Sequence, residues 1–168
     1  MISVQLADDQ ALVRAGFRAL LDGEDDMAVV AEAADGEQAV ELARSSDPEV
    51  AILDLRMPRL DGVEAARRMY AERPLPIVML TAYSDRANVE NAIGAGVFAY
   101  LVKPFKETDV VPAVRAAVAR HTELLAARRS AGETPVRALV MGVRSRSGTD
   151  WNVRIAQRED GSLDVQGA

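Results

Sequence analysis

Short apolar runs alternate with amphipathic stretches five times between residues 2 and 130. The apolar runs are typical of strands buried on both faces, as in a parallel sheet, and the stretches between them repeat with helical spacing. We expect strands near 2–7, 27–33, 49–54, 76–81 and 98–103. We expect helices near 10–21, 36–46, 62–72, 85–94 and 108–129.

Capping residues support these helix boundaries. The pairs Asp35-Gly36 and Asp61-Gly62 place an acceptor directly before the second and third helices. The last helix contains Pro112, which a helix tolerates in its first turn, so we expect Asp109 to be its N-cap.

Regular alternation of strand and helix predicts right-handed crossovers and a parallel sheet with helices on both faces. For five strands we favour the flavodoxin-like α/β fold, a doubly wound sheet in the order 2-1-3-4-5. This region spans residues 1–130, with an extended last helix.

Beyond residue 130 the pattern changes. Residues 131–135 resemble a linker, and residues 136–168 predict a short β-rich tail. Apolar residues dominate 136–143 and alternate with polar ones over 151–155, and Asp160-Gly161 is a hairpin-turn signal. We therefore expect a small C-terminal β-meander.

Composition narrows the setting. The 168 residues include no cysteine, which excludes disulfides and thiolate metal sites. We find neither a signal peptide nor an apolar stretch of the roughly 20 residues that span a membrane, so we expect a cytoplasmic protein. Residues 1–127 contain 21 acidic and 13 basic residues, whereas residues 128–168 contain 5 and 7. The acidic main body disfavours non-specific nucleic-acid binding there.

Polar residues follow or end four of the predicted strands: Asp8 and Asp9, Asp54, Thr81, and Lys103. Ligands of an open parallel sheet sit at the carboxyl ends of its strands, so these side chains should meet at one edge. Carboxylates are Mg²⁺ ligands, while an ammonium and a hydroxyl can stabilise phosphoryl oxygens. Each element alone also fits an ordinary loop, cap or turn, but their order predicts a phosphoryl-transfer site.

The same motifs resemble the receiver domain of response regulators in two-component signalling, over residue 4 to about 119. The matching stretches are Leu-Ala-Asp8-Asp9, Ile-Leu-Asp54-Leu-Arg-Met-Pro58-Arg-Leu-Asp-Gly62, Leu-Thr81-Ala82 and Tyr100-Leu-Val-Lys103-Pro104. Residues 4–69 are most similar to regulators with a LuxR-type helix-turn-helix output. Residues 76–125 are more similar to regulators with an RNA-binding ANTAR output, and we find neither output domain in residues 131–168.

The resemblance implies a role for each matching residue. Asp54 would be the phosphoacceptor, and Thr81 and Lys103 would hold the phosphoryl group as the other catalytic residues. Mg²⁺ would be bound directly by Asp9, Asp54 and the backbone carbonyl of Arg56, and through water by Asp8. Thr81 and Tyr100 would form the switch. The donor would be a sensor histidine kinase, a phosphotransfer protein or a small acyl phosphate.

Three functions compete at this point. We favour a phosphorelay switch that changes protein–protein contacts, with a homodimer through the face of helix 4, strand 5 and helix 5. The alternative is a regulator of transcription or antitermination, in which Trp151 and the nearby arginines of the tail bind nucleic acid. A Mg²⁺-dependent phosphatase typically needs a second acid two residues after the nucleophile, but position 56 is Arg. We therefore expect no enzyme activity beyond phosphorylation and dephosphorylation of Asp54 itself.

Three further residues have weaker interpretations. Arg56 and Tyr83 adjoin the expected site and either tune hydrolysis of the aspartyl phosphate or are exposed loop side chains. His121, the only histidine, is expected to be a packing or surface residue rather than a phosphotransfer group.

Overall fold

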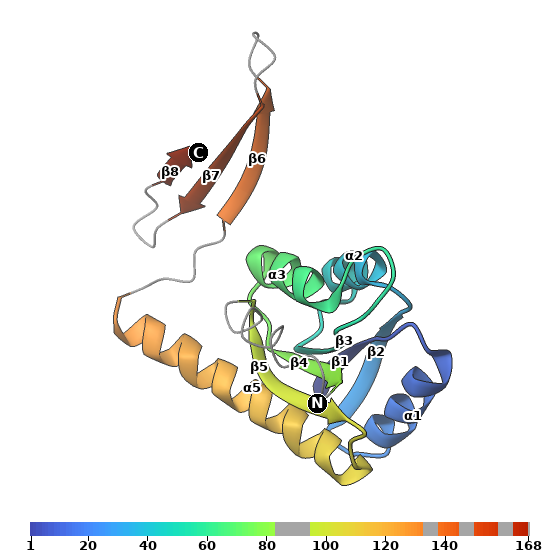
Figure 1. Ribbon diagram of the computed structural model, residues 1–168. Helices are drawn as coiled ribbons and strands as arrows, with labels where there is room; N and C mark the ends of the chain where they lie inside the picture. Colours follow the sequence, from blue (N-terminus) through green and yellow to red (C-terminus); the bar gives the residue numbers. More distant parts are fainter. Residues whose placement is uncertain (83–94, 133–137, 145–149, 158–162, 168) are drawn as a thin grey trace.

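Five parallel strands form the central sheet in the order β2-β1-β3-β4-β5 (Figure 1). They are β1 (Ile2–Ala7), β2 (Met27–Ala33), β3 (Val50–Asp54), β4 (Ile77–Ala82) and β5 (Val97–Lys103). The flavodoxin-like strand order and the predicted strand positions are thus confirmed.

This computed structural model describes residues 1–82, 95–132, 138–144, 150–157 and 163–167. The helix predicted near 85–94 lies outside the described residues, as do Tyr83 and the predicted turn at 160–161.

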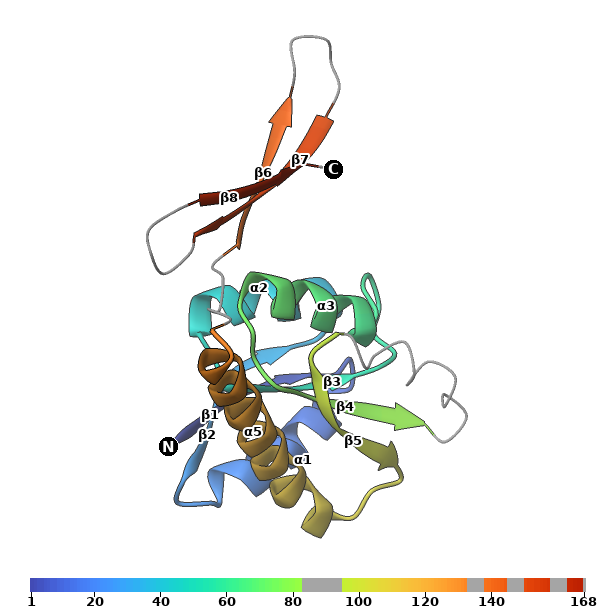
Figure 2. The ribbon, with the colours of Figure 1, turned by 90° about the vertical axis from the view of Figure 1, so that its left-hand side faces the viewer.

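Helices cover both faces of the sheet (Figures 1 and 2). Helices α1 (Ala11–Asp22) and α5 (Glu107–Ser130) pack on one face through Phe17, Leu21 and Val114, among others. Helices α2 (Gly36–Ser46) and α3 (Gly62–Glu72) pack on the other face. Among the described residues, no helix has the length and apolar character needed to cross a membrane.

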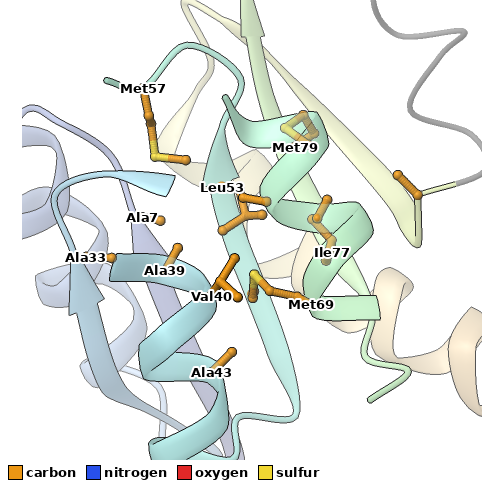
Figure 3. Close-up of a cluster of buried hydrophobic side chains, with 14 of the residues drawn as sticks. Ala7, Ala33, Ala39, Val40, Ala43, Leu53, Met57, Met69, Ile77 and Met79 are labelled. Atoms are coloured by element: carbon orange, nitrogen blue, oxygen red, sulfur yellow. The ribbon is translucent and has the colours of Figure 1, made fainter. Parts of the chain in front are cut away.

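Strand β3 shows why these runs are apolar throughout. Ile52 belongs to the cluster under α1 and α5, whereas its neighbour Leu53 belongs to the cluster under α2 and α3. Figure 3 shows Leu53 among Val40 of α2 and Met69 of α3. Successive side chains of a strand point to opposite faces, so a strand covered on both sides has no solvent-facing positions.

The caps of α2 and α3 are as predicted. The carboxylate of Asp35 accepts a hydrogen bond from the backbone N–H of Gln38 at 2.8 Å, and Asp61 accepts one from Glu64 at 2.8 Å. Each bond satisfies one of the N–H groups that a helix start leaves free.

The start of α5 corrects one expectation. Lys106, not Asp109, is the N-cap, and Asp109 lies in the first turn, where its carboxylate accepts from the Lys106 backbone N–H at 3.3 Å. The helix thus begins earlier than predicted, because Asp109 braces the first turn from within it. Pro112 consequently falls in the second turn, where it lacks the N–H that would bond to the Thr108 carbonyl.

The expected C-terminal meander is also confirmed. Strands β6 (Ala138–Arg144), β7 (Asp150–Gln157) and β8 (Leu163–Gly167) pair antiparallel in the order β6-β7-β8 (Figure 2). Trp151 and Arg154 lie in β7, but their side chains are outside what the structure describes. The described parts of the tail are therefore strands and not helices.

Candidate functional site

The sheet register brings the strand-end residues together. Ala7 pairs with Leu53, so Asp8 and Asp9 leave β1 beside Asp54 at the end of β3. Strand β4 follows, with Asp54 paired to Leu80, and Ala82 pairs in turn with Lys103 of β5. Adjacent parallel strands thus bring the strand-end acids, the Thr81 hydroxyl and the Lys103 ammonium to one edge of the sheet.

Three carboxylates gather there. One oxygen from each of Asp8, Asp9 and Asp54 lies within 4.8 Å of the others. Asp8 and Asp54 are buried, at 2% and 7% exposed, whereas Asp9 is exposed. The Oδ2 atom of Asp8 is buried without a hydrogen-bond partner. A buried carboxylate oxygen that has no hydrogen-bond partner and lies beside two further carboxylates fits a divalent cation that prefers oxygen ligands.

Lys103 supplies the positive charge of this cluster. Its Nζ atom lies 3.2 Å from Oδ1 of Asp54 and 3.5 Å from Oδ2 of Asp8. One ammonium therefore faces two buried carboxylates, which leaves negative charge in excess.

Asp54 has an unusual ionisation. Burial raises the pKa of its carboxyl above the ordinary value, and the charge of Asp8 raises it further. Lys103 lowers the pKa through its charge and a hydrogen bond, and so does the backbone N–H of Arg56, but burial and Asp8 together outweigh them. The Asp54 carboxylate is therefore costly to keep ionised without another cation nearby.

Gly62 allows helix α3 to begin against the end of strand β3. A Cβ atom at this position would lie 2.2 Å from the backbone oxygen of Asp54. The Gly62 N–H donates to the Leu55 carbonyl at 2.8 Å, which fixes the loop after Asp54. A side chain here would push the loop away from the cluster.

A cavity of 810 Å³ opens beside Asp9, between the loop after β3 and the first turns of α3. Arg56, Met57 and Arg67 are among its lining residues. The side of the cluster that Asp9 occupies is therefore reachable from outside.

The other predicted residues have the following places. Thr81 is buried in β4, and Arg56 has an exposed side chain. Tyr100 of β5 is half-buried against the cluster under α2 and α3, and burial raises the pKa of its phenol. His121 is not part of the strand-end group: it is buried between Phe98 and Tyr70, with ring centroids 5.3 and 6.3 Å away.

Arg14 contacts the acidic segment, and the sequence analysis did not predict this contact. Its Nη1 atom donates to the backbone carbonyl of Asp8 at 2.7 Å. The available signal was a charged residue on α1 beside Val13 and Phe17, on the side of the helix that packs on the sheet.

The doubly wound parallel sheet, with acids gathered at the carboxyl ends of its strands, has the architecture of receiver-type α/β domains. Residues 4–115 match the sequence model of the response regulator receiver domain. The chain belongs to this family, and its relatives are response regulators.

Curated relatives include transcription regulators. The transcriptional regulatory protein PdtaR of Mycobacterium tuberculosis is 46% identical over 123 residues, which cover 73% of this chain and 60% of that protein. The transcriptional regulatory protein LiaR of Bacillus subtilis is 40% identical over 70% of this chain and 56% of its own length. The chain therefore matches little more than half the length of these relatives.

Solved structures agree on the fold. The response regulator domain of Thermotoga maritima CheB has a TM-score of 0.66 at 28% identity, covering 71% of this chain and 97% of that one. A LuxR-family two-component response regulator from Aurantimonas has a TM-score of 0.67 at 30% identity, covering 77% and 99%.

Proposed function

We propose that this chain is a phosphorylation-dependent switch in which Asp54 accepts a phosphoryl group. The observation that carries the proposal is the grouping of Asp8, Asp9 and Asp54 at the sheet edge, with Lys103 in contact with Asp8 and Asp54. The donor is a phosphohistidine of a sensor kinase or phosphotransfer protein, or a small acyl phosphate.

Mg²⁺ is the cofactor that these residues fit, held by the three aspartates and the backbone carbonyl of Arg56. When bound, it neutralises charge on the incoming phosphoryl oxygens. Asp8 already has a buried oxygen without a hydrogen-bond partner, and Asp9 is open to solvent. The donor set of oxygens is the one that a hard divalent cation takes.

The chain's own residues divide the transfer between them. An oxygen of the Asp54 carboxylate attacks phosphorus, and an acyl phosphate bond forms. The bond from phosphorus to the donor's nitrogen or oxygen breaks, and the donor keeps the electron pair. Lys103 offers its ammonium to the phosphoryl oxygens, and the Thr81 hydroxyl donates a hydrogen bond to them. We propose no further catalytic activity, because position 56 holds Arg where a hydrolase would typically place an acid.

Thr81 and Tyr100 are the proposed switch residues. Movement of Thr81 toward the phosphoryl group opens space that Tyr100 fills from β5. A swing from 1:99 to 99:1 between two states needs roughly 5.5 kcal/mol of preference. The readout is a protein contact or homodimer through the face that includes β5 and α5, where Val102 is 46% exposed.

A regulator of transcription or antitermination is the second candidate. The relatives named above are transcriptional regulatory proteins, and residues 131–168 follow the receiver region with a small β-sheet. In this proposal residues 1–130 are the receiver, 131–135 the linker and 136–168 an output element that contacts nucleic acid.

Incubation with acetyl phosphate and Mg²⁺ tests the main proposal. We expect intact mass spectrometry to show a gain of one phosphoryl group in the wild type and none in Asp54→Ala. Asp25→Ala is the matched control, because Asp25 is an exposed acid outside the cluster. A wild type that gains no phosphoryl group, or a gain that persists in Asp54→Ala, refutes the proposal.

Two measurements on the phosphorylated full chain separate the two outputs. An elution shift on size exclusion indicates a phosphorylation-dependent homodimer. A mobility shift of labelled DNA or RNA indicates the second candidate.

A further inference from the structure

Arg14 ties helix α1 to the loop that carries two of the three clustered acids. Besides the 2.7 Å bond from Nη1 to the Asp8 carbonyl, its backbone N–H donates to the Gln10 carbonyl at 3.2 Å. The Gln10 N–H in turn donates to Oδ1 of Asp8 at 2.8 Å. The short segment from Asp8 to Gln10 is thus held at both of its ends.

The Arg14 side chain is itself held in place. It is 17% exposed, and its Nε atom lies 3.5 Å from Oε2 of Glu32 on β2. Nε is buried without a hydrogen-bond partner, so the charge of Glu32 is its compensation. Arg18, one turn further along α1, pairs with the other oxygen of Glu32 and with Asp22.

We infer that Arg14 is a positioning residue for the acidic cluster: it fixes the Asp8–Asp9 segment in the arrangement that binds Mg²⁺. The hydrogen bond goes to a carbonyl between the two acidic side chains, so it constrains both of them without using either carboxylate. Glu32 balances the guanidinium, so the constraint adds little positive charge where a cation must bind. This inference rests on the proposed Mg²⁺ site.

An ordinary stabilising ion pair is the alternative interpretation. Ion pairs near the protein surface contribute about 0–1 kcal/mol to stability. If Arg14 served only its pairing with Glu32, its removal would leave the Mg²⁺ affinity unchanged. Residues that orient metal ligands behave differently, since their loss typically lowers metal affinity by roughly 10- to 100-fold. Metal affinity, measured in folded protein, therefore separates the two.

The test uses Arg14→Met, which keeps the apolar stem and removes the guanidinium. We expect the Kd for Mg²⁺, from a titration followed by amide chemical shifts, to rise roughly 10-fold. In the metal-free protein we expect faster hydrogen exchange at the Gln10 amide, because its acceptor Asp8 is no longer fixed. Saturating Mg²⁺ should restore the rate of labelling by acetyl phosphate.

Arg18→Met is the matched control, because Arg18 shares Glu32 but has no bond to the Asp8 segment. We expect its Kd and its Gln10 exchange rate to stay within about 2-fold of the wild type, and Arg14→Lys to recover part of the affinity. If Arg14→Met does not fold, Arg14→Gln takes its place, since its shorter side chain does not reach the carbonyl.

Three results overturn the inference: an unchanged Kd in Arg14→Met, an unchanged Gln10 exchange rate, or an equal loss of affinity in Arg18→Met. A wild type that binds no Mg²⁺ and accepts no phosphoryl group refutes the proposed function instead. The two failures are therefore distinguishable.

Discussion

Asp54→Asn should make the metal-free protein more stable than the wild type. The substitution keeps the size of the side chain and removes its charge. In the wild type this charge is buried, and its pKa is raised by burial first and by Asp8 as well. At neutral pH the folded state therefore carries an ionisation penalty that the unfolded chain does not.

The size of the effect follows from the distances. At an effective dielectric constant of 20 and the full 4.8 Å, each of the two repulsions on Asp54 is worth about 3.5 kcal/mol. The attraction to Lys103 at 3.2 Å is worth about 5 kcal/mol. Neutralising Asp54 thus removes about 7 kcal/mol of repulsion and loses about 5. Screening reduces the repulsion from Asp9, which is exposed, but Asp54→Asn also removes the burial penalty of the charge, so we expect a net gain of about 1 to 2 kcal/mol.

Urea unfolding followed by circular dichroism at pH 7.5, in EDTA and in Mg²⁺, measures this difference. In EDTA the unfolding midpoint of Asp54→Asn should exceed that of the wild type, while Asp25→Asn should stay close to the wild type. Mg²⁺ at 100 times the wild-type Kd should stabilise the wild type by about 2.7 kcal/mol and the variant by less. The gap between the two proteins should then close.

A variant that is less stable than the wild type in EDTA would falsify the reasoning, since it would mean that the pairing with Lys103 outweighs both repulsions and the burial. An equal response of both proteins to Mg²⁺ would separately exclude Asp54 as a ligand.

Three further predictions use the same unfolding assay. Lys103→Gln should lower stability in EDTA and increase the stabilisation by Mg²⁺, because the carboxylates lose their ammonium; a smaller Mg²⁺ response contradicts this. Gly62→Ala should lower the free energy of unfolding by about 1–3 kcal/mol, because the added Cβ would meet the Asp54 backbone oxygen. Gly16→Ala, in helix α1 with open space around the added Cβ, should instead raise the free energy of unfolding by about 0.5–1 kcal/mol. Burial, with the charges of nearby arginines, lowers the pKa of His121 in the folded protein. As pH falls below about 6.5, His121 is therefore protonated in the unfolded chain before it is protonated in the folded protein. From pH 7.5 to 5.5 the wild type should therefore lose up to about 1 kcal/mol relative to His121→Phe, and parallel pH profiles refute this.

The fold could be predicted from the sequence because its signals are local and repeated. The apolar run at 50–53, for example, is buried on both faces and indicates a covered parallel strand without reference to any other residue. The same holds for Asp35 and Asp61, whose caps depend on neighbours three residues away. The start of α5 was misplaced because Pro112 suggested a first turn, while the actual brace is the backbone bond to Asp109.

The grouping of residues at the sheet edge could be predicted from the sequence, but the side-chain contacts around that group could not. Sheet topology alone brings the acids, Thr81 and Lys103 to one edge. The contact between Arg14 and Asp8 joins residues six apart, across a loop and a helix start, and the place of Arg14 on the apolar side of α1 does not by itself identify its partner. The burial of His121 likewise depends on Phe98 and Tyr70, which come from two other elements.

The acids at the sheet edge are less well compensated than other acids of the chain. Elsewhere in the part of the chain that the structure describes, acids such as Asp35 and Asp61 cap helices, and Glu64 and Glu72 pair with arginines. Here, in contrast, Asp8 keeps an oxygen without a hydrogen bond, and Asp54 is buried beside a like charge. Such an arrangement is expected to lower the stability of the metal-free fold, and it is the kind of arrangement on which the proposed function rests. A bound cation would relieve the repulsion among these carboxylates. The more strongly they repel one another without metal, the larger the part of the Mg²⁺ binding free energy that comes from charge neutralisation. Stability without metal and affinity for metal should therefore change in opposite directions when Lys103 is replaced. Replacement of Arg14 should instead lower metal affinity by loosening the Asp8–Asp9 segment.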